Sequence, residues 1–432
     1  MASEDKFTVG DYVTLQRGTT YSGELVGEPG PPLLGLGSIE PGGGFRSSGF
    51  KTFGGDCPPA LMVRPGETYV ALKGATKDGS MVGSVARLPR GLPAGRLTQD
   101  TARMDFLDPD PDVATHVYWV LRTPEYRAYC AGRLTGSAAA SFSRSDLLAY
   151  PVPPITRVRR ALVRLLDAIE DKIELNREMV ETLEATARAL FKSKLVDLDP
   201  VRAKSEGLDP SQPKRVADIV PDRFMDSKLG EIPAGWNVVG LDAIARFRNG
   251  LALQKFPPTH GKSLPVIKIA QLHSGNTDGA DLASGDLAPD FIVEDGDVLF
   301  SWSGSLECVL WAGGPGALNQ HLFKVTSSTY PKWFYYFWIH EHLDDFRAVA
   351  AGKATTMGHI QRHHLSQAMV VVPPAPTLEM LDPIIGPLFE SMWRLAVQSR
   401  TLGEIRDVLL PRLTSGELRI PEAGPRVEAV PV

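Results

Sequence analysis

The sequence predicts an α/β (α+β) chain in which two globular regions alternate with two long helices as a tandem duplication. Three observations support this fold class. A heptad pattern occupies residues 153–195, a partial copy of it lies near the C-terminus, and a Gly- and Pro-rich region with short apolar runs precedes each copy. Two similar halves in one chain indicate pseudo-two-fold symmetry.

The first long helix is predicted over residues 153–195. Core-type residues recur about every 3.5 residues, which is the spacing of a coiled-coil seam. No Gly or Pro follows Pro154 in this segment, and Thr156 is a candidate N-cap. At about 1.5 Å per residue the helix would be roughly 60 Å long, so it needs a partner helix. The pattern consists of Ile155, Val158, Leu162, Leu165, Ile169, Ile173, Asn176, Val180, Leu183, Ala187 and Leu190.

The partner helix is predicted in the same chain, over residues 373–420. Pro373-Pro374 repeats Pro153-Pro154, and Thr401-Leu402 repeats Thr182-Leu183. Prolines and a glycine at 383, 386 and 387 favour a break, so this helix is expected to be effective only from about Leu388. We expect the two helices to form an antiparallel coiled coil. Its seam is predicted to contain Ile169, Ile173, Asn176, Leu183 and Leu190 on one helix and Leu388, Leu395, Leu402 and Leu409 on the other.

Asn176 is the polar exception in this apolar row. One buried Asn fixes the register of many coiled coils, and exposure at a position slightly off the seam is the alternative.

The globular regions are predicted over residues 1–152 and 236–372. Short β-like runs cover 69–72, 81–85, 264–270 and 297–302, and helices are expected over 113–130 and 332–349. Residues 196–235 are expected to be an extended linker, because prolines alternate there with charged residues. Residues 421–432 are expected to be a tail.

Composition favours an ordinary cytoplasmic protein. The chain has 432 residues, of which 43% are hydrophobic and 22% charged, and its net charge is −5. No signal peptide is expected, and no apolar run approaches the roughly 20 residues of a membrane span. Three widely spaced cysteines predict neither a disulfide framework nor a zinc site. The net charge argues against nonspecific polyanion binding but allows a local basic face.

Several segments together resemble the specificity (S) subunit of type I restriction-modification systems. The resemblance covers both long helices, the connection between them and the duplicated plan. It is carried by residues 173–177, 181–185, 189–193, 196–204, 226–236 (DSKLGEIPAGW) and 410–418 (LPRLTSGEL).

The resemblance implies two target-recognition domains, here residues 1–152 and 236–372, held apart by the coiled coil. Each domain would read one half of a bipartite, asymmetric double-stranded DNA target. Two methyltransferase subunits that use S-adenosylmethionine would dock on the helices. Endonuclease/translocase subunits, which need ATP and Mg, would join them. No cofactor or metal is expected on this chain itself, and the break at Pro383, Gly386 and Pro387 departs from the family plan.

The sequence lacks the motifs expected of an enzyme acting alone. Residues 57–60 and 372–375 carry Pro-Pro without the acidic or amide residue and the aromatic of an adenine methyltransferase loop, and no GxxxxGK[ST] loop occurs. Glu170-Asp171-Lys172 resembles part of a nuclease site, but solvated helix charges explain it better. His359 and His363 have i, i+4 spacing, for which metal binding, surface histidines and DNA-proximal histidines remain open.

Candidate DNA-binding residues are donors and acceptors in Gly- and Ser-rich stretches. Turns that join strands, or ordinary surface arginines, are the alternative reading of these stretches. The aromatic run 333–338 is expected to form a helix core rather than to stack on bases. The candidates are Lys73, Lys77, Arg87, Gln99 and Arg133 in the first region, and Trp302, Ser303, Asn319, Gln320, His321, Lys353, Thr355, Thr356, His359 and Arg362 in the second.

The predicted function is a non-catalytic DNA-sequence reader that also scaffolds enzyme subunits. One alternative is a nuclease or methyltransferase acting alone, which the missing motifs disfavour. Another is the recognition subunit of a related phage-defence methylation system with different effector enzymes. The target sequence does not follow from the chain.

Overall fold

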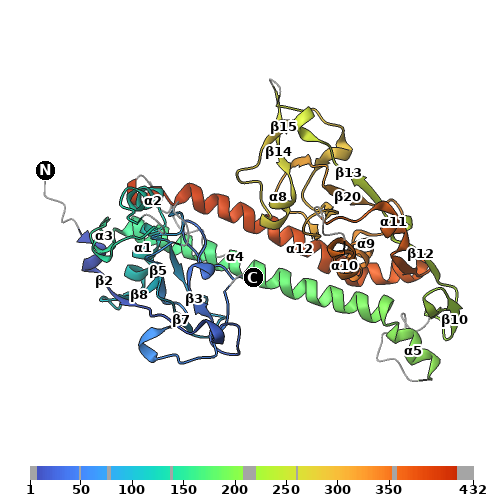
Figure 1. The fold of residues 1–432 in the computed structure, drawn as a ribbon, viewed down its shortest axis with the longest axis horizontal. Helices are drawn as coiled ribbons and strands as arrows, with labels where there is room; N and C mark the ends of the chain where they lie inside the picture. The colour runs from blue at the N-terminus through green and yellow to red at the C-terminus, as the bar shows by residue number, and fades with distance from the viewer. Residues whose placement is uncertain are drawn as a thin grey trace, which may run out of the picture. The chain divides into compact units, whose positions relative to one another are not determined.

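Two 35-residue helices, α4 (Arg157–Phe191) and α12 (Ala375–Leu409), are the longest elements of the computed structural model (Figure 1). The structure describes residues 7–47, 50–74, 79–136, 140–207, 220–258, 261–352 and 358–415. It divides into unit 1, Met1–Asp171 with Gly403–Val432, and unit 2, Lys172–Leu402. The division falls inside both long helices, so each unit contains a part of each.

Unit 1 contains a four-stranded antiparallel sheet, β2-β8-β5-β6, a three-stranded sheet, β3-β7-β4, and the pair β1-β9. Its strands are β1 (Phe7–Thr8), β2 (Val13–Arg17), β3 (Leu33–Leu34), β4 (Met62–Val63), β5 (Thr68–Ala71), β6 (Val85–Arg87), β7 (Gly95–Leu97), β8 (Thr101–Phe106) and β9 (Pro151–Val152). Its shorter helices are α1 (Pro111–Val120), α2 (Pro124–Ala131), α3 (Arg144–Leu148) and α13 (Arg412–Ser415).

Unit 2 contains the sheets β13-β20-β17-β18 and β15-β14-β19-β16 and the pairs β12-β21 and β10-β11. Its strands are β10 (Phe224–Ser227), β11 (Gly230–Pro233), β12 (Asn237–Gly240), β13 (Arg246–Asn249), β14 (Ser263–Ile267), β15 (Leu282–Ser284), β16 (Ile292–Val293), β17 (Val298–Ser301), β18 (Cys308–Leu310), β19 (Gly316–Leu318), β20 (Leu322–Thr326) and β21 (Met369–Val372). Its shorter helices are α5 (Asp199–Ser205), α7 (Leu241–Ile244), α8 (Ile269–Ser274), α9 (Lys332–Glu341), α10 (Leu343–Ala351) and α11 (Arg362–Gln367).

The predicted duplication is confirmed by the strand topology. The order β2-β8-β5-β6 in unit 1 matches β13-β20-β17-β18 in unit 2, and β3-β7-β4 matches β14-β19-β16, each with one parallel and one antiparallel pairing. The α/β fold class with two long helices is therefore confirmed as well.

Within each unit the two long helices run antiparallel, as predicted. In unit 1, Arg159 Nε donates to the Leu413 carbonyl at 2.9 Å, and Arg406 Nη1 lies 3.3 Å from Glu170 Oε2. In unit 2, Asn176 Nδ2 donates to Gln398 Oε1 at 2.9 Å, whereas residue 194 borders the same small pocket as residues 377 and 381. Later residues of α4 thus contact earlier residues of α12, as in an antiparallel pair.

The seam differs in detail from a strict heptad. Leu165 is 49% exposed, and Leu166 is buried in its place. This part of α4 packs in the core of unit 1 together with α1, so a second neighbour as well as α12 decides which face is covered. Of the predicted seam residues, Ile169 and Asn176 are buried, and the half-buried ones are Ile173, Leu183, Leu190, Leu388, Leu395, Leu402 and Leu409.

The expected break in the second helix is wrong, because α12 continues through Pro383 and Pro387. Each proline lacks the backbone N–H that would donate a helix hydrogen bond. Pro383 and Pro387 lie one turn apart and are both exposed, so the two missing hydrogen bonds are on one solvent-facing side of the helix. The opposite face is buried at Leu381, Ile385 and Phe389, and this packing holds the helix together.

The expected extended linker at residues 196–235 is also not what the structure shows. Its described parts contain helix α5 and the β10-β11 hairpin. Val201, Val220 and Ile232 are buried in the core of unit 2. The alternation of prolines with charged residues concealed these apolar contacts, because each contact comes from a different short segment.

Glu170 is not a solvated helix charge, contrary to the sequence interpretation. Its carboxylate lies 3.2 Å from Arg122 Nη1 and 3.3 Å from Arg406 Nη1, all within unit 1. Burial would raise the pKa of this carboxyl, but the two guanidinium groups lower it below its usual value. The residue is therefore a structural anion and not part of a nuclease site.

The aromatic run forms the core of unit 2, as predicted, but the helix there ends earlier. Helices α9 and α10 replace the single helix expected over 332–349, and α1 and α2 replace that over 113–130. Residues 333–338 are all buried. The Phe191 ring of α4 lies 5.4 Å from Phe337 and 5.3 Å from Trp338, so α4 completes this core.

Acid should destabilise unit 2 through His340 of α9. Its Nε2 is buried without a hydrogen-bond partner among the described residues, and burial followed by nearby Arg188 lowers its pKa from 6.5 to about 4. The unfolded chain then binds a proton that the folded chain does not. The stability that comes with a neutral His340 is fully present above 6.5, the pKa of this side chain in the unfolded chain. It is lost as the pH falls toward about 4, its pKa in the folded chain. Between about pH 7.5 and about pH 5 the free energy of unfolding should fall by about 2 kcal/mol through this one side chain.

The measurement is urea unfolding of the full chain at both pH values. His340→Gln should flatten the pH dependence, and His363→Gln, at an exposed position, should leave it unchanged. Equal pH dependence in the His340 variant and the unmodified chain would contradict the assignment.

Candidate nucleic-acid interface

In unit 2 the sequence-predicted polar residues meet at one edge of the sheet. Strand β13 ends at Asn249 and β17 ends at Ser301, and their partners on β20 are Phe323 and Leu322 at its start. The segments that follow β13 and β17 and the segment that precedes β20 therefore lie together. An antiparallel bridge between Ser303 and His359 adds a fourth segment.

The side chains of this edge form one hydrogen-bonded cluster. Ser303 Oγ lies 3.0 Å from His321 Nδ1, and Gln320 Nε2 lies 3.3 Å from His321 Nε2. Trp302 Nε1 donates to the Gln320 carbonyl at 3.1 Å, and Asn319 Oδ1 accepts from the His321 backbone at 3.2 Å. The Trp302 ring is 5.8 Å from His321 and 6.3 Å from His359. The structure thus brings six predicted residues into one site.

Burial separates these residues into two roles. Ser303 and Asn319 are only 4% exposed, so they orient their neighbours. Trp302, Gln320, His321 and His359 are half-buried and keep polar atoms near the surface. Ser303 pairs with His321 but is almost fully buried, so the polar atoms that this set keeps near the surface are fixed donors and acceptors, which suit recognition of a polar surface.

Unit 1 has the equivalent edge. Lys73 follows β5, is exposed and bridges to Ser141, just as Ser303 follows β17 and bridges to His359. Gln99 is exposed, and its carbonyl accepts from Arg17 Nε at 3.4 Å. Lys73 and Gln99 are adjacent, because the Leu72 and Lys73 backbones both donate to the carbonyl of the residue after Gln99.

Two glycines allow the chain to cross closely at these edges. A Cβ on Gly18 would meet the Thr98 carbonyl oxygen at 2.0 Å, and one on Gly250 would meet the Asn319 carbonyl oxygen at 2.2 Å. Only glycine fits at either position, so both copies use the same close approach to place the segment after the first strand.

Two other candidates, Arg87 and Arg133, lie elsewhere, whereas Arg362 lies beside the unit 2 edge, over the Phe323 ring at 5.6 Å. Arg87 is held at 3.0 Å by Asp167 of α4 and serves the packing of unit 1. Arg133 lies over the Tyr129 ring at 3.7 Å, and Arg362 donates to the Phe247 carbonyl at 3.4 Å. Lys77, Lys353, Thr355 and Thr356 lie outside the described residues.

Sequence reasoning missed the first strand of each edge. Arg17-Gly18 and Asn249-Gly250 sit at the strand ends beside the predicted residues. The available signal was a polar residue followed by glycine directly after a strand-like run, in corresponding places of both halves.

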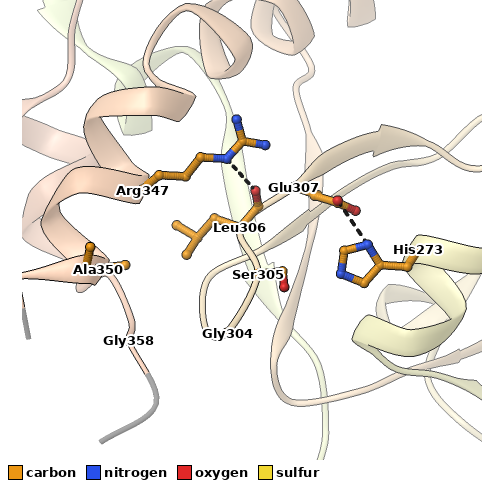
Figure 2. A pocket seen from close by; sticks show the side chains of 9 residues that line it. His273, Gly304, Ser305, Leu306, Glu307, Arg347, Ala350 and Gly358 are labelled. Atoms are coloured by element: carbon orange, nitrogen blue, oxygen red, sulfur yellow. Dashed lines mark hydrogen bonds and ion pairs between the residues drawn. The ribbon is translucent and has the colours of Figure 1, made fainter. Parts of the chain in front are cut away.

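Next to the unit 2 cluster lies an open hollow of about 530 Å³, between the turn after β17 and helices α8 and α10. Figure 2 shows His273 and Arg347 approaching this turn from opposite sides. His273 Nδ1 is 3.0 Å from Glu307 Oε1, and Arg347 Nε donates to the Leu306 carbonyl at 3.2 Å. These contacts brace the turn that carries Ser303.

Among the described residues, no group of three or more His, Cys, Asp or Glu side chains is arranged to hold a metal ion. None of the described helices is both long and apolar enough to cross a membrane.

Comparison with known proteins agrees with the resemblance. The specificity subunit of the type I restriction enzyme MjaIX from Methanocaldococcus jannaschii is 25% identical over 415 residues, which cover 88% of this chain and 91% of that protein. The chain is a homologue of type I restriction enzyme specificity subunits. The HindI specificity subunit from Haemophilus influenzae is 23% identical over 350 residues, covering 68% of this chain and 75% of that protein. No family model matches the chain.

The fold is shared with a solved specificity subunit. The S subunit of the type I restriction-modification system from M. genitalium matches with a TM-score of 0.55 at 15% identity, over 96% of this chain and 97% of that one. This match confirms the predicted fold, and the curated relatives confirm the resemblance inferred from the sequence.

Gly250→Ala should disturb the unit 2 edge. The added methyl group must displace the Asn319 backbone, and we expect a destabilisation of about 1–3 kcal/mol in urea unfolding. Gly261→Ala is the matched control, because a Cβ there meets nothing within 4 Å. Equal stability of the two variants would contradict the close approach.

Proposed function

We propose that this chain is the non-catalytic DNA-recognition subunit of a type I restriction-modification complex. The observation that carries the proposal is the pair of equivalent polar edges, one in each unit, each built from the same strand ends and the same close-approach glycine. Homology to named specificity subunits along most of the chain supports the same function.

Each unit reads one half of a bipartite, asymmetric double-stranded DNA target. The backbone of the two edges corresponds, but the side chains do not: Lys73 stands where unit 2 has Ser303, and Thr98 where it has Asn319. Different donors and acceptors at equivalent positions select different bases, so the half-sites differ.

Enzyme subunits supply the chemistry. We propose two methyltransferase subunits that bind S-adenosylmethionine, with endonuclease/translocase subunits that use ATP and Mg, in the cytoplasm. Exposed apolar pairs on the long helices support two docking sites. Unit 2 exposes Leu175 and Met179 by 48% and 40%, and unit 1 exposes Ile405 and Val408 by 44% and 63%.

A related phage-defence methylation system with different effector enzymes would use the same recognition chain. The genes that neighbour this one distinguish the two functions, since only the first requires an ATP-driven endonuclease subunit.

Exchanging one recognition domain should change one half-site. Residues 236–372 are replaced by the corresponding segment of the HindI homologue, and Trp333, Phe334, Phe337 and Trp338 are kept because they contact Phe191 of α4. Genomic methylation mapping should show one altered half and one unchanged half. The reciprocal exchange of residues 1–152 is the control. An exchange that alters both halves or neither would refute the one-domain, one-half-site proposal.

The assembly should contain two methyltransferase subunits per chain. When Leu175 and Met179 are both changed to Glu, the co-expressed complex should lose one methyltransferase subunit, because charges are costly to bury in an apolar contact. Native mass measurement of the complex checks this. The complex should methylate DNA, whereas the chain alone, given S-adenosylmethionine, ATP and Mg, should neither methylate nor cut it. A single methyltransferase subunit in the unmodified complex would argue against the proposed stoichiometry.

A further inference from the structure

We propose that Arg17 and Asn249 are equivalent base-contacting residues, which read a guanine in one half-site and an adenine in the other. This inference rests on the proposed DNA-recognition function and assigns specificity to two residues at its site.

The two positions have the same backbone pairing in the two units. Arg17 pairs with Ala102 on β8, and Asn249 pairs with Phe323 on β20. The next residue in each case is the close-approach glycine, whose N–H donates at 3.0 Å to the Thr101 carbonyl in unit 1 and at 3.1 Å to the Leu322 carbonyl in unit 2.

The pairing continues one residue further. A parallel bridge joins Thr19 to Thr98, and another joins Leu251 to Asn319. Strand register, glycine and bridge therefore all agree in the two units, so Arg17 and Asn249 leave their strands at the same point of the fold.

Both side chains are exposed and retain unused donors. Arg17 makes one long contact, from Nε to the Gln99 carbonyl at 3.4 Å, and its two terminal nitrogens have no hydrogen bond or ion pair among the described residues. The Asn249 side chain likewise has no hydrogen bond there. Exposed donors of this kind bond to water in the chain alone and are available to a base edge.

Arginines with a structural role in unit 1 make several hydrogen bonds to other residues of the unit. The buried Arg96 side chain donates to the Asp56 carbonyl at 3.1 Å and to Thr19 Oγ1 at 3.3 Å, and so fixes the segment that follows Gly18. Arg122 bonds to Tyr118 at 2.9 Å and to Glu170 at 3.2 Å. Arg17 lacks such contacts although it stands at the predicted edge.

The chemistry of the two side chains sets the expected bases. The planar guanidinium presents two parallel donors that match O6 and N7 of guanine, and an Asn amide presents a donor and an acceptor that match N7 and N6 of adenine. One fold position thus carries different base preferences in the two units.

The test uses the complex purified through a tag on the full chain, and a duplex DNA pool with randomised positions that is sequenced after binding. The unmodified complex should select two half-sites. Arg17→Gln should lower the preference for guanine at one position by roughly tenfold or more, because the Gln amide lacks the two parallel donors of the guanidinium. Asn249→Ala should do the same for one adenine in the other half-site.

Each variant carries its own control, because the unaltered half-site reports that the chain is folded and bound. Arg64→Gln is the matched control for charge, since Arg64 is exposed and precedes β5 at the opposite end of the same sheet. Selection of both half-sites with unchanged preferences in the Arg17 and Asn249 variants overturns this inference and leaves the proposed function standing. An unmodified complex that selects no sequence overturns both.

Discussion

The antiparallel pairing of α4 with α12 is the constraint on which the rest of the structure depends. Neither globular region closes its core alone. In unit 2 the aromatic helix α9 packs against Phe191 of α4 and Phe389 of α12. In unit 1, Leu162 and Leu166 of α4 share a core with Leu410 and Leu413, which follow α12. Each core therefore requires segments from distant parts of the sequence to meet before it can exclude water.

Polar residues on the helix pair specify how these segments meet. Asn176 is fully buried, and its amide donates to Gln398, while its Oδ1 accepts no hydrogen bond among the described residues. In unit 1 the Glu170 carboxylate joins Arg406 of α12 to Arg122. Buried polar groups of this kind contribute little net stability but penalise other registers, in which they would be left unpaired. We infer that they select one alignment of the two helices.

Duplication with divergence fits the proposal that each unit reads a different half-site. What the copies share is backbone: strand order, register, bridges and the glycines at 18 and 250. What differs is the set of side chains at the edge, where Lys73 and Arg17 in unit 1 correspond to Ser303 and Asn249 in unit 2. A rigid shared frame holds the polar groups in place, so a change of side chain alters recognition without altering the fold.

The sequence by itself determined the duplicated α/β plan, the two long helices and the family resemblance, because hydrophobic period and repeated segments are local signals. It also located the polar stretches around Ser303, Asn319 and His359. Only the tertiary structure decided that these stretches converge, that Arg17 and Asn249 stand beside them and that Arg87 does not. It also decided that α12 continues through Pro383 and Pro387 and that Glu170 is a half-buried structural anion. These outcomes depend on contacts between residues far apart in the chain: a core that outweighs two missing hydrogen bonds, and strand ends brought together by register. No local pattern contains that information.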